Sequence, residues 1–243
     1  MGLFRSVAAL LFIVAVPVAL LTTSIRIVLN EPRVYEYATD HYDTPVTTGI
    51  ARSELLQASA ELRAYFNRSG DEPLFIRVQQ DGQPVSLFNQ RETAHMQDVK
   101  TLFRATFRIQ EAAVVFVLAY VVGVFIWARE GTLRTLARQL LLSALAGVAV
   151  MGVAGLVAIA GFDAFWERFH IIAFSNDLWQ LDPSRDRLIQ MFPEAFWQDV
   201  SLWIGIGTLV ELVVLGLGAA MYIGLTREDP MTYDATLAHG ARA

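Results

Sequence analysis

Four long apolar stretches alternate with polar segments along the chain. They cover residues of about 6–29, 112–128, 138–162 and 200–225. A bilayer core about 30 Å thick is crossed by roughly 20 mostly apolar residues in a helix. The pattern therefore predicts four membrane-spanning helices. We expect the first to be a retained span rather than a cleaved signal peptide, because no small-x-small cleavage site ends its apolar block.

Two long polar connections, about 30–110 and 162–199, are expected on the same side of the membrane, because two spans separate them. The short link between the second and third spans carries Arg129, Arg134 and Arg138. The positive-inside rule places such a link in the cytoplasm. Both termini are then cytoplasmic as well, and the two long connections form extracytoplasmic segments.

The first outer segment shows signals of local structure. Thr47 and Thr48 can cap a helix that ends near Asn67. Residues 74–79 and 85–88 alternate around a polar turn, which predicts a small β-hairpin. A helical pattern then resumes and continues into the second span. We therefore expect residues 1–243 to form a single all-α membrane domain with one hairpin outside the membrane.

Composition agrees with this class and excludes others. Of the 243 residues, 54% are apolar and 18% are charged, and the mean hydropathy is +0.42. The net charge is −5 and no Lys/Arg block is present, so nucleic acid is not an expected partner. The absence of cysteine excludes disulfides, thiol nucleophiles and Cys-ligated zinc on this chain.

The second outer segment is unusually aromatic, with Trp166, Trp179 and Trp197 among several phenylalanines. An aromatic belt at the membrane–water boundary explains most of these residues. It does not explain the polar residues interleaved with them, such as His170 and Asn176. Polar groups in an apolar surrounding need partners or a function.

His95 and His170 are the candidate catalytic residues, one in each outer segment. Glu92 and Asp98 flank His95 at i−3 and i+3 on its helical face. Either carboxylate could orient the ring and raise its basicity. The two histidines with carboxylates could also bind zinc, although no His-Glu-x-x-His pair is present.

No Gly-x-Ser-x-Gly motif or phosphate-binding glycine loop is present, and no serine is marked as a nucleophile. Acyl chemistry would therefore be direct, with histidine as acid and base. Glu211 lies near the middle of the fourth span, where a carboxyl group is costly. We expect it to be buried against another span in a structural role.

Several motifs resemble one bacterial family. Residues 169–174 read Phe-His-Ile-Ile-Ala-Phe and are followed by Asp177-x-Trp179. Residues 188–199 read Leu-Ile-x-Met-Phe-Pro-x-x-Phe-Trp-x-Asp, and residues 95–100 read His-Met-Gln-Asp-Val-Lys. In these motifs and in topology the chain resembles the lipoprotein intramolecular transacylase (Lit) family of four-span integral membrane proteins.

The resemblance implies an acyltransferase of the bacterial cytoplasmic membrane that uses no cofactor. Its partners would be membrane lipids and a lipoprotein whose N-terminal Cys carries a diacylglyceryl group. The enzyme would move the sn-2 acyl chain to the Cys α-amino group at the outer leaflet, giving the lyso-form lipoprotein. His170 and His95 would be the catalytic pair.

Roles for these residues follow from proton-transfer chemistry. His170 is expected to deprotonate the α-ammonium group, because the pKa values of the two groups, about 6.5 and about 8, are close enough for transfer. His95, oriented by Asp98 or Glu92, would polarise the ester carbonyl or protonate the departing oxygen. Further interactions with the headgroup region could come from three residues: Arg168, Asn176 and Trp179.

Two other functions remain open at this point. The chain could be a membrane scaffold or sensor without catalytic activity, in which the outer segments form a docking surface. It could also be a metal-dependent membrane hydrolase that uses the same histidines. Alanine at either histidine separates a scaffold from an enzyme, and bound zinc would favour the hydrolase.

Overall fold

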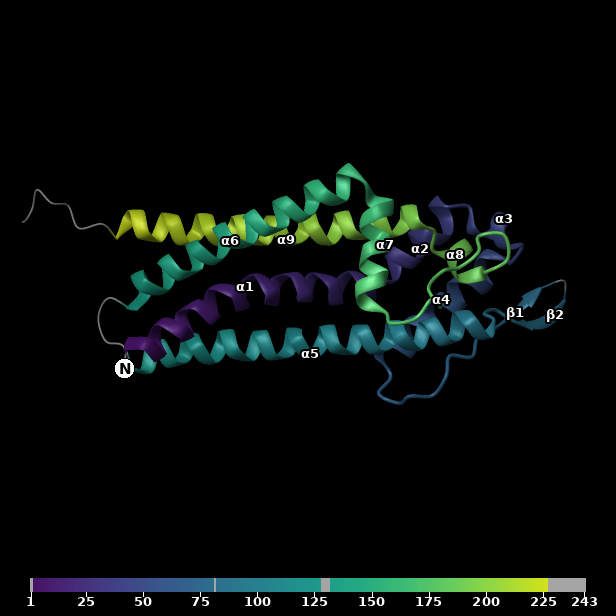
Figure 1. The fold of residues 1–243 in the computed structure, drawn as a ribbon, viewed down its shortest axis with the longest axis horizontal. Helices are drawn as coiled ribbons and strands as arrows, with labels where there is room; N and C mark the ends of the chain where they lie inside the picture. Colours follow the sequence, from purple (N-terminus) through teal and green to yellow (C-terminus); the bar gives the residue numbers. More distant parts are fainter. Residues whose placement is uncertain (1, 81, 128–131, 227–243) are drawn as a thin grey trace, which may run out of the picture.

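Four long helices form a bundle in the computed structural model, which describes residues 2–80, 82–127 and 132–226 (Figure 1). They are α1 (Gly2–Asn30), α5 (Gln90–Trp127), α6 (Thr132–Ala160) and α9 (Glu194–Leu225). In the described part of the chain, these four are long and apolar enough to cross a membrane. The prediction of an all-α fold with four membrane helices is confirmed.

The shorter elements lie in the two long connections. Between α1 and α5 are α2 (Pro32–His41), α3 (Thr44–Thr48), α4 (Arg52–Asn67), β1 (Arg77–Gln80) and β2 (Gln83–Ser86). Between α6 and α9 are α7 (Phe162–Ala173) and α8 (Arg187–Met191). Figure 1 shows all of them at one end of the bundle. We call these seven elements, together with the polar first part of α5, the head.

The opposite end of the bundle carries the start of α1, the end of α5, the start of α6 and the end of α9 (Figure 1). Both long connections therefore share one side, as the order of the spans predicts. Two of the arginines used for orientation, Arg134 and Arg138, are in α6. The third, Arg129, lies outside the described residues.

One predicted helix divides into two. Thr48 ends α3, and Gly49 follows with φ +67, a left-handed conformation that glycine adopts at little cost. The Gly49 N–H donates to the carbonyl oxygen of Pro45, and α4 begins only at Arg52. The prediction that Thr47 and Thr48 cap the longer helix is therefore wrong, because these threonines close a short helix instead.

The hairpin and the long helix after it agree with the sequence. Strands β1 and β2 pair antiparallel, with Val78 opposite Val85. Helix α5 has 38 residues, so it is about 57 Å long and exceeds the thickness of a bilayer core. Its apolar part, from Ala112 onward, can cross the membrane, whereas its charged first part belongs to the head.

Close packing holds the bundle together. Helix α1 packs against α5, α6 and α9, and α6 packs against α9. A Cβ atom on Gly147 of α6 would lie 2.9 Å from both methyl carbons of Leu212 and 3.0 Å from Pro17 Cβ. Glycine at this position lets three helices approach one another, as small residues do in membrane proteins.

Glu211 differs from its predicted place. It is exposed on α9 rather than buried, and the Ser24 hydroxyl of α1 donates to its carboxylate at 3.4 Å. The buried face of α9 instead contains Thr208, Leu212 and Gly216. Glu211 precedes Leu212 by one position, a rotation of about 100° around the helix, and so lies at the edge of that face.

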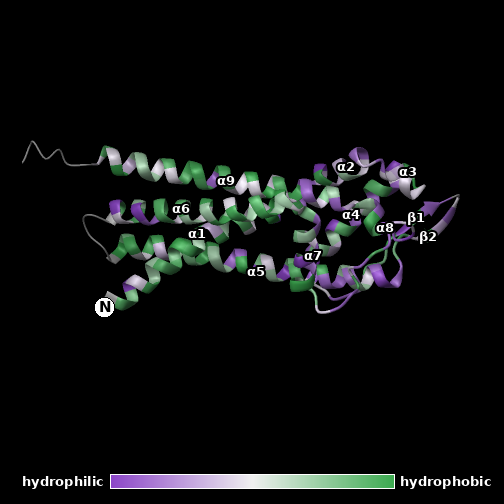
Figure 2. Ribbon diagram, turned by 45° about the horizontal axis from the view of Figure 1, so that its top comes forward, coloured by the Kyte–Doolittle hydropathy of each residue, from purple (hydrophilic) through white to green (hydrophobic). Residues whose placement is uncertain are grey.

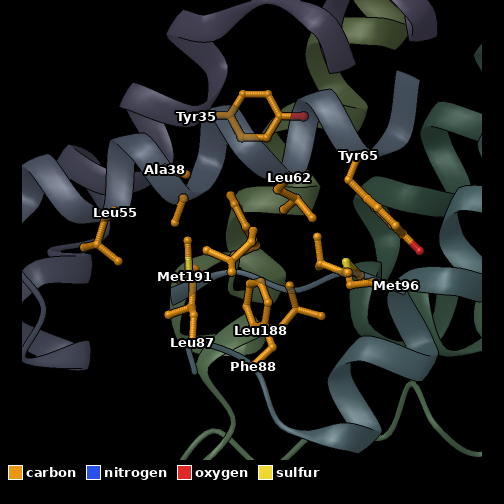
Figure 3. Packing of buried hydrophobic residues seen from close by; sticks show 14 of the residues in the cluster. Tyr35, Ala38, Leu55, Leu62, Tyr65, Leu87, Phe88, Met96, Leu188 and Met191 are labelled. Atoms are coloured by element: carbon orange, nitrogen blue, oxygen red, sulfur yellow. The ribbon is translucent and has the colours of Figure 1, made fainter. Parts of the chain in front are cut away.

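The head has an apolar core of its own. Figure 3 shows side chains from α2, α4, α5 and α8 converging there, together with Leu87 and Phe88, which follow the hairpin. Figure 2 shows hydrophobic residues predominating along the four long helices and hydrophilic residues gathering in the head. The head therefore packs like a water-soluble protein, with apolar side chains inside and polar ones outside.

Candidate functional site

The two histidines from separate connections meet in the head. His95 is in α5 and His170 is in α7, and their ring centroids are 6.2 Å apart at an interplanar angle of 35°. They are 6% and 7% exposed. Two buried histidines from distant parts of the sequence thus form one pair.

Polar contacts hold α5 against the segment that follows α7. Helix α7 runs across the end of the bundle (Figure 1), and the chain then turns back along α5. The Asn176 amide donates to the Asp98 carboxylate at 2.9 Å, and the Arg91 guanidinium donates to the carbonyl oxygen of Asp177. These contacts connect the segment carrying His170 to the turns around His95.

His170 is held in one tautomer. Its Nδ1 lies 2.8 Å from the carbonyl oxygen of Trp166. A carbonyl oxygen can only accept, so Nδ1 carries the proton and Nε2 keeps a free lone pair. The Trp179 ring stacks on the imidazole at 4.9 Å and the Trp166 ring meets its edge at 4.6 Å. Burial lowers the pKa of His170 and so favours its neutral, basic form. The hydrogen bond to Trp166 partly opposes this effect.

His95 is also favoured in its neutral form. It lies about 25 Å along α5 from Ala112, outside the part that can cross the membrane. Burial, with a smaller contribution from His170, lowers the pKa of His95 to about 4, against an opposing effect of Asp98. Its Nδ1 is buried and has no hydrogen-bond partner in the part of the chain that the structure describes. At neutral pH the pair therefore consists of two uncharged imidazoles.

Of the two acids expected to orient His95, Glu92 has other partners. Its oxygens accept from the backbone N–H groups of Asn89 and Leu188, each at 2.7 Å. The Asn89 side chain accepts from the Glu92 N–H at 3.0 Å, which completes a capping box at the start of α5. Glu92 therefore ties α5 to α8, whereas Asp98 remains near enough to His95 to act on it electrostatically.

The other predicted site residues differ in their relation to the cavity described below. Trp179 stacks on His170 and lines that cavity. Asn176 does not line it; its amide donates to Asp98, and its side-chain oxygen accepts from the Leu178 N–H. Arg168 is exposed on α7 and does not line the cavity.

A cavity of about 400 Å³ contains both histidines and is lined mainly by apolar side chains. Its walls come from both the head and the bundle, including Leu29 at the end of α1 and Val200 in α9. Glu194, the first residue of α9, is the one acid among its lining residues in the described part of the chain. Glu194 is not among the residues predicted from the sequence, because an acid in the first turn of a helix ordinarily interacts with the helix dipole.

The metal alternative lacks a set of ligands in the described residues. Across residues 2–80, 82–127 and 132–226, no three His, Asp or Glu side chains are grouped so that they could hold a metal ion. The histidine pair has no carboxylate completing such a set within that part of the chain. The geometry instead suits proton transfer between two neutral rings and a bound substrate.

The chain is similar to known proteins over most of its length. Residues 10–197 match the family model described as lipoprotein intramolecular transacylase Lit. A protein of Aquifex aeolicus (strain VF5), described only as uncharacterized, is 26% identical over 217 residues. That match covers 88% of this chain and 94% of the relative.

Solved structures show the same fold. The in meso structure of the membrane integral lipoprotein intramolecular transacylase Lit from Bacillus cereus gives a TM-score of 0.75 at 18% identity, covering 92% of this chain and 97% of that one. A structure of the same protein with a histidine-to-alanine mutation gives a TM-score of 0.73 at 17% identity, with coverages of 93% and 96%. At this identity the likeness is one of fold.

Proposed function

Because the chain belongs to the lipoprotein intramolecular transacylase Lit family and is therefore a membrane acyltransferase, we propose that it moves the sn-2 acyl chain of a diacylglyceryl-modified lipoprotein to the α-amino group of the N-terminal Cys. The product is the lyso-form lipoprotein. The observation that carries this proposal is the pair of neutral histidines, His95 and His170, in one apolar cavity. No cofactor takes part in the proposed reaction.

His170 acts as the general base. Its Nδ1–H is engaged by the Trp166 carbonyl, so Nε2 is free to accept a proton from the α-ammonium group. The pKa of a free α-amino group is about 8. Proton transfer to His170 then converts the ammonium into the nucleophilic amine.

His95 stabilises the charge that develops on the ester carbonyl oxygen. Because its pKa is lowered to about 4, it is neutral at pH 7 and acts by donating a hydrogen bond rather than as an imidazolium. The ring lies beside His170, so one substrate group placed between them contacts both. Asp98 contributes through its charge.

The step balances without an additional reactant. The amine nitrogen forms a bond to the sn-2 carbonyl carbon, and the bond from that carbon to the glycerol oxygen breaks. The nitrogen loses two protons in total; one ends on the glycerol oxygen and one leaves through His170 to solvent. Both reacting groups belong to one molecule, so the cavity accelerates the reaction chiefly by holding them at attacking distance.

The apolar lining supports acyl transfer over hydrolysis. A cavity of about 400 Å³ lies within the range that holds small ligands, and its hydrophobic walls suit an acyl chain. Water in such a site would compete with the amine for the ester. Exclusion of water from the pair therefore favours the transacylated product.

The head is proposed to lie at the outer leaflet of the bacterial cytoplasmic membrane, with both termini cytoplasmic. Arg134 and Arg138, at the start of α6, support this orientation through the positive-inside rule. They are at the bundle end opposite the head (Figure 1). Lipid-anchored lipoproteins would then reach the cavity from the leaflet that surrounds it.

Mass spectrometry of an N-terminal lipopeptide tests the reaction. A lipoprotein is expressed with this protein in a host that lacks N-acylating enzymes. We expect one acyl group on the Cys amine and a free hydroxyl on the glycerol, and we expect His170→Ala to leave the diacylglyceryl form. Unchanged lipopeptide with folded wild-type protein would refute the proposal and favour a scaffold, and release of free fatty acid would indicate a hydrolase.

A further inference from the structure

Glu194 lines the cavity that contains both histidines, and its chemistry is not used in the mechanism above. It is the first residue of α9 and follows Pro193, so it precedes the apolar part of that helix. One of its carboxylate oxygens, Oε1, is buried and accepts no hydrogen bond from an N–H or O–H group of the described residues, and its neighbour is the carboxyl group of Asp163. Two neighbouring carboxyl groups need either a shared proton or a cationic ligand, so this position points to a ligand that can donate a hydrogen bond and supply positive charge.

The cavity offers a second unsatisfied group. His95 is 6% exposed, lines the same cavity, and its Nδ1 has no partner. Two polar side chains in this mainly apolar cavity therefore each carry a buried atom that makes no hydrogen bond to the described residues. A ligand with both a hydrogen-bond donor and an ester group would satisfy them together.

Glu194 and His170 border on the same pair of tryptophans. The Trp166 and Trp197 rings stack at 5.4 Å and 21°. Trp197 is three residues after Glu194 in α9, so these two residues lie on the same face of that helix. Trp166 is four residues before His170 in α7, so these two also share a helix face. The Trp166 ring also contacts the His170 ring at 4.6 Å. Glu194, His170 and both tryptophans line the same cavity, so a group bound by Glu194 shares that cavity with the proposed general base.

We propose that Glu194 binds the free α-ammonium group of the substrate's N-terminal Cys and so selects lipoproteins whose amino terminus is unmodified. This inference rests on the proposed function. The ammonium is the one cation that the reaction itself requires at the site, and it needs a counter-charge when it leaves water. Both histidines are neutral, so Glu194 is the one group among the lining residues described that can carry a negative charge at neutral pH, and a bound ammonium favours this ionised form.

Asp163 adjusts the charge of this carboxyl. Burial, together with the neighbouring Asp163 carboxyl, raises the pKa of Glu194 above its ordinary value. The empty cavity thus favours a carboxyl group that shares or holds a proton. An arriving ammonium has the opposite effect and favours the carboxylate, so ligand binding and ionisation of Glu194 support each other.

Selection by charge also separates substrate from product. After transfer the nitrogen belongs to an amide, which is neutral and offers a much weaker partner to a carboxylate. The product therefore loses the contact that held the substrate. A lipoprotein that already carries an N-acyl chain lacks the same contact and is disfavoured from the outset.

Binding of two matched lipopeptides tests the inference without turnover. Both carry an ether in place of the sn-2 ester, so no acyl transfer occurs; one has the α-amino group and the other has hydrogen in its place. We expect purified wild-type protein to bind the amine about 10- to 100-fold more tightly, as for a charge-assisted contact in an apolar site. Glu194→Gln should bind both peptides equally.

Two further variants complete the test. Glu194→Asp keeps the charge and should retain a preference for the amine. Glu167→Gln, an exposed acid of α7, is the matched control and should keep the wild-type ratio. A ratio that is the same in Glu194→Gln as in wild type, or equally lost in Glu194→Asp and Glu194→Gln, would overturn the inference.

Failure of this inference differs from failure of the proposed function. If the wild-type protein transacylates the natural ester but Glu194→Gln keeps the amine preference, the site inference alone is wrong. If the wild-type protein prefers the amine through Glu194 but transfers no acyl chain, the cation site stands and the proposed reaction is wrong.

Discussion

The bundle and the head differ in where their large apolar side chains lie, because lipid surrounds the bundle and water surrounds the head. In the bundle, large apolar residues such as Leu118 and Leu156 point outward and are 60% and 70% exposed. In the head, residues such as Leu55 are fully buried beneath a polar surface. Apolar side chains gain little free energy by leaving lipid, so the helices of the bundle associate through close packing. Apolar side chains in water gain free energy on burial, so the head forms an apolar core.

The candidate site lies where these two regions meet. Its cavity takes apolar walls from both, and its polar atoms come from the head and from the first turn of α9. The proposed substrate has both acyl chains and a charged amine, and so suits both kinds of surroundings. We therefore propose that the chemistry depends on the head and that the bundle anchors the head at the membrane.

Removal of the proposed base in the head should have the largest effect. We expect His170→Ala to lower the rate of acyl transfer by about 10²- to 10⁴-fold, because general base catalysis is lost. The matched control is His41→Ala, whose ring stacks on Tyr37 outside the cavity. Transfer would be followed by mass spectrometry, and equal rates in the two variants would show that His170 is not the base.

The next largest effect should separate a buried leucine from a lipid-facing one. Leu55→Ala removes a 0% exposed side chain from the head core. We expect it to lower the free energy of unfolding by about 2–5 kcal/mol. Leu156→Ala, at a 70% exposed position, should change it by less than about 0.5 kcal/mol. Unfolding in detergent measures both, and similar losses would mean that the two regions do not differ in packing.

Close packing in the bundle can be tested with a pair of glycines. Gly147→Ala places a methyl group 2.9 Å from the Leu212 methyl carbons, so we expect a loss of about 1–3 kcal/mol in stability. A methyl group at Gly152 would have no neighbouring atom within 4 Å, so Gly152→Ala should be neutral or stabilising by up to about 1 kcal/mol. If both variants unfold alike, the three-helix contact does not limit stability.

Acid should weaken the head through the histidine pair. The pKa of His95 is about 4 when folded, against 6.5 ordinarily. Between these values the unfolded chain binds more protons, so stability falls as pH drops from 6.5 towards 4. The effect is about 1 kcal/mol at one pH unit below the unfolded pKa. Thermal unfolding across this pH range should show a smaller loss of stability in His95→Phe than in the wild-type protein. An equal loss in the two proteins would mean that groups other than His95 cause the pH dependence.

Much of the fold could be predicted from the sequence, because membrane spans depend on composition over long windows. The hairpin followed from alternation around Gly82. The helix start at Thr48 was wrong because one residue, Gly49, decides whether those threonines open or close a helix. Helix starts and ends are decided by a few neighbouring residues. Here the pattern of two possible capping threonines outweighed the single glycine in the prediction.

The candidate histidines could be named from the sequence, but their contacts could not be predicted from it. His95 and His170 could be chosen from the sequence, whereas their meeting depends on how α7 folds across the bundle. The interaction of Glu92 with Asn89 could have been predicted from the Asn89-x-x-Glu92 spacing, which is that of a capping box. Glu194 could not be separated from an ordinary helix-start acid until the cavity was known.

The smallest expected effect concerns the one acid within the fourth span. Glu211 is exposed on α9 and has a long 3.4 Å contact with Ser24, so Glu211→Gln should change stability by less than about 1 kcal/mol. Acyl transfer should be unchanged, because Glu211 does not line the cavity. Ser24→Ala is the matched control for the lost contact. A large loss of transfer in Glu211→Gln alone would show that the bundle supplies chemistry as well as anchorage, and the division between the two regions would have to be abandoned.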